Sequence, residues 1–127
     1  MTATAWSTGE LEEIATRDEM RVAPRRTDGT LTKPRIVWMV RVGDDVYIRS
    51  VKGVEGAWYR TTRSRGEGHV NAGAVDKEVA FLDVEDSDDL QARIDAEYHA
   101  KYDRYPGPVA SITSAKARAT TMRLVPR

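Results

Sequence analysis

The sequence contains no cysteine and only two histidines, His69 and His99. The lack of cysteine excludes disulfide bonds, thiolate metal sites and cysteine nucleophiles. The two histidines lie 30 positions apart and no set of residues has the spacing of a zinc site, so we predict no metal. Neither a Gly-x-Ser-x-Gly motif nor a phosphate-binding P-loop is present, which removes support for a hydrolase or a nucleotide triphosphatase. No residue is therefore assigned a catalytic role.

The chain also lacks an excess of charge and a long apolar run. Its formal net charge at pH 7 is +0, which argues against binding to nucleic acid. No apolar run approaches the roughly 18 residues of a membrane span, and residues 1–6 have neither the basic nor the apolar region of a signal peptide. We expect a cytoplasmic protein without nucleic-acid or membrane partners, folded as a single domain over residues 1–127.

Local patterns predict more strands than helices. Short apolar stretches bounded by glycine and polar turns are typical of strands. Ser7 and Glu10 have the spacing of a capping box that begins a helix, and Gly66 is placed to end another. Six strands are expected over residues 20–25, 36–40, 46–50, 69–72, 78–84 and 119–125, and helices over residues 7–17, 58–65 and 87–102.

These elements favour a small antiparallel barrel. The strand at 36–40 is the most apolar run of the chain, and we expect it to be buried on both faces. Turns at 43–45 and 73–77 join successive strands as hairpins, and the Pro-Gly-Pro stretch at 106–108 predicts a loop. A parallel sheet would need a helical crossover after almost every strand, and the helices are too few for that. The predicted fold class is mainly β (α+β), a six-stranded antiparallel barrel with two or three helices.

Basic and aromatic residues flank the predicted hairpin over residues 36–50. Lys33 and Arg35 precede its first strand, and Arg49, Ser50 and Lys52 end its second. If the two strands pair through the 43–45 turn, Arg35 and Ser50 lie near the same end of the sheet. A further set follows a glycine-bracketed loop: Trp58, Tyr59, Arg60 and Arg63.

Cationic side chains gathered at one mouth of a barrel can hold a phosphate. Arginine makes bidentate contacts with phosphate oxygens, and glycine lets backbone N–H groups approach closely. Trp58 or Tyr59 could then cover a planar ring system. A second interpretation stays open, in which the charges form a solvated rim over a core tryptophan.

Residues 25–84 resemble the split-barrel superfamily of pyridoxamine-phosphate-oxidase-like proteins, and within it the deazaflavin-dependent nitroreductases. The stretch 27–40, with Gly29, Lys33, Pro34 and Arg35 before the apolar run, is similar to the basic turn of that group. Residues 50–53 (Ser-Val-Lys-Gly) and the Trp-Tyr pair at 58–59 are similar to its Ser-Lys-Gly-Gly and Trp-Tyr segments. The whole chain also resembles a bacterial family of uncharacterised domains placed near these barrels.

The resemblance implies a split β-barrel that binds flavin mononucleotide (FMN) or a deazaflavin coenzyme and acts as an oxidoreductase on a small organic molecule. It implies a phosphate clamp of Lys33, Arg35 and Lys52, assisted by Arg60 or Arg63. Ser50 and Gly53 would supply backbone donors, and Trp58, with Tyr59 beside it, would face the ring. A homodimer is also implied, because the cofactor of split barrels usually lies at a dimer interface.

Two other functions remain open from the sequence. A barrel without any cofactor could bind a small ligand or a partner protein. Two departures from the family pattern favour it: Val51 separates Ser50 from Lys52, and residues 60–62 (Arg-Thr-Thr) stand where the family has Asn-Leu. A haem or tetrapyrrole binder is the third alternative, with His69 or His99 as an axial ligand.

Overall fold

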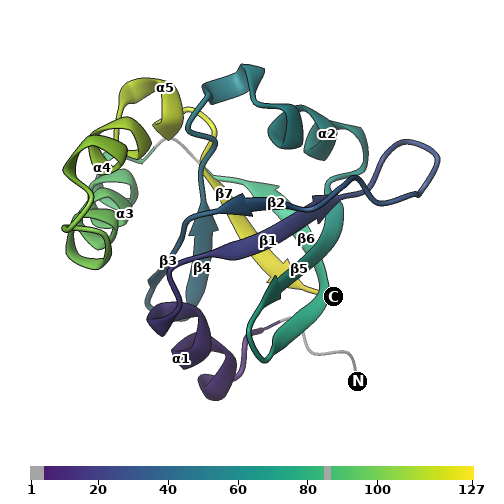
Figure 1. The fold of residues 1–127 in the computed structure, drawn as a ribbon, viewed down its shortest axis with the longest axis horizontal. Coiled ribbons are helices and arrows are strands. Elements are labelled where there is room, and N and C mark those ends of the chain that lie inside the picture. The colour runs from purple at the N-terminus through teal and green to yellow at the C-terminus, as the bar shows by residue number, and fades with distance from the viewer. Residues whose placement is uncertain (1–4, 85–86) are drawn as a thin grey trace.

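One antiparallel sheet of seven strands organises the chain, as a computed structural model of residues 5–84 and 87–127 describes it (Figure 1). Residues 1–4, part of the segment tested above for a signal peptide, lie outside the described residues. The elements are α1 (Thr8–Thr16), β1 (Met20–Pro24), β2 (Arg35–Val37), β3 (Met39–Val42), β4 (Asp45–Ile48), the 3-10 helix η1 (Gly53–Glu55), α2 (Ala57–Arg65), β5 (Glu67–Ala72), β6 (Val75–Asp83), α3 (Asp88–Lys101), α4 (Pro106–Ile112), α5 (Ala115–Arg118) and β7 (Met122–Pro126).

The sheet curls into a nearly closed barrel. Its strand order is β2-β1-β5-β6-β7-β4-β3, so the two edge strands are β2 and β3. These two strands are consecutive in the chain and are separated by Trp38 alone. The chain therefore steps from one edge of the sheet to the other at this residue, which brings the edges together. The predicted antiparallel α+β barrel is confirmed, with seven strands in place of six.

The prediction of one continuous strand over residues 36–40 was wrong, and its division accounts for the seventh strand. We expected one strand buried on both faces, but the stretch is divided between β2 and β3, and the Ile36 side chain is 57% exposed. Ile36 pairs with Arg21 of β1 and points to the outside of the barrel. An apolar run alone does not reveal such a change of edge, because its residues are equally apolar on both sides of the step.

Apolar side chains form two cores, one on each side of β3 and β4. The first fills the barrel and includes Met20, Val22, Met39, Ile48, Val70, Val79, Met122 and Leu124. The second lies between the outer face of β3 and β4 and the C-terminal helices, and includes Val40, Tyr47, Ile94, Tyr98, Tyr102, Val109 and Ile112. In Figure 1, α3, α4 and α5 accordingly gather on one side of the barrel, whereas α1 and α2 lie at opposite ends.

Most of the predicted turns and ends are confirmed. Gly43 and Gly73 have positive φ values in the β3–β4 and β5–β6 hairpins, and Gly66 ends α2 in the left-handed region with φ 65°. The second hairpin is tighter than expected, because β6 begins at Val75. The capping box of Ser7 and Glu10 is present at α1, and α3 matches the helix expected over residues 87–102.

The prediction of a loop at residues 106–108 was wrong, because they begin α4. Proline in the first turn of a helix loses no hydrogen bond and already has a helical φ, so a Pro-Gly-Pro stretch can start a helix. Val109 and Ile112 then anchor α4 in the second core. With α5 the described residues contain five α-helices, and the last strand begins at Met122 rather than at residue 119. No helix in 5–84 or 87–127 is both long and apolar enough to cross a bilayer.

Candidate functional site

A cleft runs along the junction of β2, the β4–α2 loop and α2. Three adjoining depressions make it up, and Trp58 lines all of them. We call them the apolar compartment, of about 220 Å³, the first basic compartment, of about 380 Å³, and the second basic compartment, of about 210 Å³. Ile36 and Val51 are shared by the apolar and first basic compartments, and Arg35 and Ala57 by the two basic ones.

Five of the residues singled out from the sequence meet at this cleft. Arg35, Ser50, Lys52 and Trp58 line the first basic compartment, and Lys33 lines the second, next to Arg35 and Trp58. Arg35 begins β2, and Ser50 and Lys52 lie in the loop that leads from β4 to α2. These residues meet because this loop and the start of β2 line the same compartment.

Val51 does not displace its neighbours from the cleft. Its side chain is 49% exposed and lines both the apolar and the first basic compartment. Ser50 and Lys52 flank it in the same compartment. The residue that interrupts the family pattern therefore adds an apolar wall and leaves the lysine in place.

The N-terminus of α2 opens onto the first basic compartment. Gly56 is its N-cap residue, no side chain caps this end, and no acidic residue stands in the first turn. The first N–H groups of a helix lack intrahelical partners, and together with the helix dipole they favour an anion. The Ser50 hydroxyl lies directly beneath Gly56, where the Cβ of any other residue would collide with it. A larger residue at this position would force the Ser50 hydroxyl to move.

The predicted backbone donors have other partners. The Ser50 N–H donates to Thr120 Oγ1 at 2.8 Å, and the Gly53 N–H donates to the Ser50 carbonyl at 2.9 Å. Gly53 has a φ of 70°, and a Cβ there would press on the Lys116 side chain. These two groups shape the loop, and the start of α2 provides the free N–H groups instead.

The cations that line the two basic compartments have no acidic partner among the described residues. None of the ion pairs found within residues 5–84 and 87–127 includes Lys33, Arg35 or Lys52. The positive charge of the cleft is therefore left for solvent or a ligand.

Three other predicted site residues do not join the cleft. Arg63 forms a bidentate pair with Asp83 at 2.6 and 2.7 Å, and this hydrogen bonding holds the pKa of Arg63 above its ordinary value. Tyr59 is buried in the barrel core and accepts a hydrogen bond from Arg63 at 3.0 Å. Arg60 is exposed and lines none of the three compartments.

Aromatic and aliphatic side chains form the walls of the apolar compartment. Trp38 stacks on Tyr102, the C-cap residue of α3, with ring centroids 4.0 Å apart and planes 4° from parallel. The Tyr102 hydroxyl is fixed in turn, accepting from the Met39 N–H at 3.2 Å and lying 2.8 Å from the Asp18 carbonyl. Further walls are Ile36, Val37, Val51, Trp58, Pro108 and Ile112. The sequence patterns did not predict Pro108 and Ile112 as site residues, because they did not predict the helix α4 that carries them.

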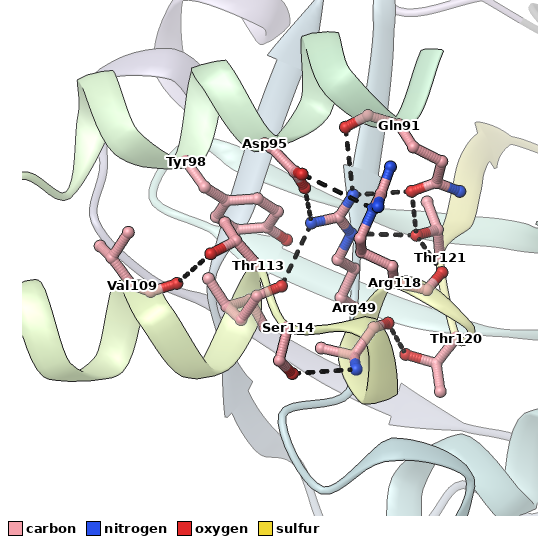
Figure 2. Close-up of polar contacts among 12 residues, drawn as sticks. Arg49, Gln91, Asp95, Tyr98, Val109, Thr113, Ser114, Arg118, Thr120 and Thr121 are labelled. Atoms are coloured by element: carbon pink, nitrogen blue, oxygen red, sulfur yellow. Dashed lines mark hydrogen bonds and ion pairs between the residues drawn. The ribbon is translucent and has the colours of Figure 1, made fainter. Parts of the chain in front are cut away.

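Arg49 is the one charged residue among the described residues that line the apolar compartment, and it is 1% exposed (Figure 2). Its Nε donates to Thr121 Oγ1 at 2.9 Å, and Nη2 donates to Gln91 Oε1 at 2.7 Å. Nη1 donates to Asp95 Oδ1 at 2.5 Å and to the Ile112 carbonyl at 3.1 Å. The sequence placed Arg49 among the cations of the barrel mouth, but its donors are used within the protein.

These contacts join four elements around one guanidinium. Gln91 and Asp95 belong to α3, Ile112 ends α4, and Thr121 precedes β7. The ring of Tyr98 lies 5.4 Å from the guanidinium carbon. The second oxygen of Asp95 faces Arg118 Nε at 3.5 Å, so the carboxylate lies between two arginines. Arg49 thus fixes the helices that complete the cleft.

Replacing Arg49 should destabilise the fold. Arg49→Met removes the closest donor of the partly buried Asp95 carboxylate and one of the two donors to the Gln91 amide oxygen, and we expect a loss of about 1.5–3 kcal/mol in the free energy of unfolding. Chemical denaturation followed by circular dichroism measures it. The exposed Arg93→Ala on α3 is the control, expected within about 0.5 kcal/mol of wild type. A loss below about 1 kcal/mol for Arg49→Met would contradict a structural role.

Neither histidine lines the cleft. His99 is exposed on α3, and His69 lies on β5 between two acidic residues of β6. Its Nδ1 is 2.6 Å from Glu78 Oε2, and its Nε2 contacts Asp76. Hydrogen bonding to Asp76 and then to Glu78 outweighs burial and raises the pKa of His69. No cluster of three metal-type side chains occurs in the part of the chain that the structure describes.

The His69 contacts predict a pH dependence of stability. Because the folded pKa is raised above the unfolded value of about 6.5, protonated His69 stabilises the fold fully below that pH, and the contribution disappears as pH rises through the folded pKa. The difference in unfolding free energy between wild type and His69→Gln should therefore shrink from pH 5.5 to pH 9. Urea denaturation at each pH measures it. A difference that grows with pH would show that the neutral imidazole is the stabilising form.

The fold and the cleft define a small α+β protein whose nearly closed antiparallel barrel carries a lateral, half-basic, half-apolar cleft. The chain belongs to the family of uncharacterized proteins conserved in bacteria (DUF2255), whose profile matches residues 10–124. This confirms the whole-chain resemblance to a bacterial family of uncharacterised domains. No curated protein matches the sequence.

Solved structures share the fold at low sequence identity. HutZ, the haem storage protein from Vibrio cholerae, is 11% identical with a TM-score of 0.65, and the match covers 94% of this chain and 89% of HutZ. The conserved hypothetical protein Rv2991 from Mycobacterium tuberculosis is 10% identical with a TM-score of 0.57, covering 98% and 82%. A protein named F420 reductase is 22% identical with a TM-score of 0.50, covering 91% and 90%. At these identities the likeness concerns the fold.

Proposed function

We propose that this protein binds a flavin-type cofactor, FMN or a deazaflavin coenzyme, in the cleft and transfers hydride or electrons to a small organic molecule. One observation carries the proposal. Unpaired cations and an uncapped helix N-terminus lie directly beside an apolar compartment that two tryptophans border. Such a cleft suits a ligand that is planar and apolar at one end and anionic at the other.

The first basic compartment is suited to the phosphate of this ligand. Arg35 presents a planar guanidinium that can bind two phosphate oxygens, whereas Lys52 adds a point charge. The open N-terminus of α2 adds backbone N–H donors and the positive end of the helix dipole. Because neither Arg35 nor Lys52 forms an ion pair among the described residues, no such contact has to break when the anion binds.

The apolar compartment is suited to the ring system. An apolar cavity of about 150 Å³ accommodates benzene, so the compartment of about 220 Å³ can take part of a larger ring. Trp58 lines it together with the first basic compartment, a position from which its ring can contact both ends of a ligand. The stacking of Trp38 on Tyr102 holds the opposite wall.

The assignment explains why the cleft lacks an acid–base pair. A flavin or deazaflavin supplies the redox chemistry when bound, and the protein supplies binding, orientation and exclusion of water. Arg35 and Lys52 bind the anion, Trp58 orients the ring, and Pro108 and Ile112 limit access of water. The names of two structural neighbours, a haem storage protein and an F420 reductase, are in keeping with a planar ligand on this fold. Haem is the less suited ligand, because neither histidine reaches the cleft.

Cofactor titration tests the proposal. We expect purified wild-type protein to bind FMN or a deazaflavin coenzyme well below about 100 µM. Lys52→Ala should weaken that binding at least about tenfold, because it removes one charge-assisted contact. Absorption and calorimetric titrations measure both affinities, and Arg93→Ala should bind as wild type does.

Riboflavin, which lacks the phosphate, provides the matched ligand control. Its affinity should be weaker than that of FMN and insensitive to Lys52→Ala. If neither cofactor binds at about 100 µM, the oxidoreductase proposal fails. The remaining function is then that of a cofactor-free barrel that binds another small ligand or a protein.

We further propose that the protein forms a homodimer through the face that carries the cleft. Ile36 and Val51 border the cleft and are 57% and 49% exposed, and the equally apolar Val54 follows in the same loop. Exposed apolar side chains grouped in this way are typical of interfaces. Light scattering should give twice the mass of the chain, and Val51→Asp should give the monomer mass. A wild-type monomer at all concentrations would contradict the dimer.

A further inference from the structure

The positively charged part of the cleft consists of two compartments rather than one. The first holds Lys52 and Ser50 beside the start of α2, whereas the second holds Arg26 and Lys33 on the loop between β1 and β2. Arg35 and Trp58 separate the two and line both. Anions bound in the two compartments would share Arg35 but have different lysines.

The charges exceed what one phosphate needs. A phosphate monoester carries about −1.5 to −2 at neutral pH, which Arg35 and Lys52 together balance. Arg26 and Lys33 then remain, and neither forms an ion pair among the described residues. Asp28, the acidic residue of the same loop, lines neither compartment. Hydrogen bonds from the hydroxyl and backbone of Thr30, and then the charge of Arg26, lower the pKa of Asp28, so this carboxylate offsets part of the Arg26 charge and leaves that of Lys33.

The loop that forms the second compartment is held in place by its own hydrogen bonds. The Arg26 N–H donates to the Thr30 carbonyl at 2.8 Å, and its Nη1 donates to the Leu31 carbonyl at 3.0 Å. The Thr32 N–H donates to the Pro24 carbonyl at 2.9 Å. A preformed loop loses little conformational freedom when an anion binds.

A hydroxyl in the second compartment lacks a partner. Thr32 lines this compartment, and its Oγ1 is a buried oxygen without a hydrogen-bond partner within residues 5–84 and 87–127. Buried polar atoms are normally hydrogen-bonded, so this hydroxyl, next to Lys33 and Arg35 in the same compartment, is available to a water molecule or to a ligand oxygen. Its hydrogen can donate to an anionic oxygen.

We infer that the second compartment is a separate anion site, formed by Arg26, Thr32, Lys33 and Arg35, and that the natural ligand carries two anionic groups on its polar end. The inferred ligand rests on the proposed function, because that function supplies its ring system. The second anion site can bind an anion that carries no ring. It makes a ligand with a diphosphate, or with a phosphodiester and a second acid, a better fit than a single phosphate monoester.

Inorganic phosphate provides a test that is independent of the cofactor. We expect a titration followed by two-dimensional NMR to shift two groups of backbone amide signals with separable affinities, one in residues 50–58 and one in residues 26–33. Lys52→Ala should weaken the first at least about fivefold and spare the second, and Lys33→Ala should do the reverse. Arg35→Ala should weaken both, and Arg93→Ala neither.

The outcomes separate this inference from the proposed function. Shifts in residues 50–58 alone, or a loss of both groups on Lys33→Ala, would overturn the second site and leave the first. Shifts in residues 26–33 without shifts in 50–58 would support the second site and count against the proposed phosphate site. Lys33 and Lys52 are both exposed, so the unchanged remainder of each spectrum verifies that the variants are folded.

Discussion

The cleft depends on the buried charge of Arg49. A guanidinium removed from water is stable only when its donors are satisfied, and here Asp95, Gln91, Thr121 and the Ile112 carbonyl satisfy them. Because these partners lie on α3, at the end of α4 and before β7, their hydrogen bonds hold α3 and α4 against the barrel in the observed position. Docking in that position brings Pro108 and Ile112 to the cleft. An internal ion pair therefore sets the shape of an external binding surface.

The second constraint is the uneven pairing of charge. The formal net charge is +0, yet the arginines away from the cleft are largely matched with acids, as in the pairs of Arg63 with Asp83 and Arg25 with Glu78. The cations of the two basic compartments are not matched among the described residues. They come from residues 26–35 and from Lys52, and the step of the chain at Trp38 from one sheet edge to the other brings these stretches together. A chain without net charge therefore has a local group of unpaired cations that can bind an anion.

Local signals were enough to predict much of this arrangement. The capping box at Ser7, the glycine that ends α2 and the hairpin turns depend on neighbouring residues. We predicted that Arg35 and Ser50 meet through pairing across one hairpin, but Arg35 pairs with Val22 of β1, and the two residues meet because the chain changes sheet edge at Trp38. Features that depend on distant partners were not predictable. The roles of Arg49 and Arg63 are set by Asp95 and Asp83, which lie on other elements. The division of the apolar run at Trp38 and the helix begun by Pro106 reflect packing against α3, which no local pattern reveals.

A crystal structure of the protein with FMN would show directly whether the cleft binds the cofactor. We expect the phosphate against the N-terminus of α2, in contact with Arg35 and Lys52, and the ring extending past Trp58 towards Trp38. A phosphate bound away from Arg35 and the first turn of α2, or a ring outside the apolar compartment, would contradict this expectation.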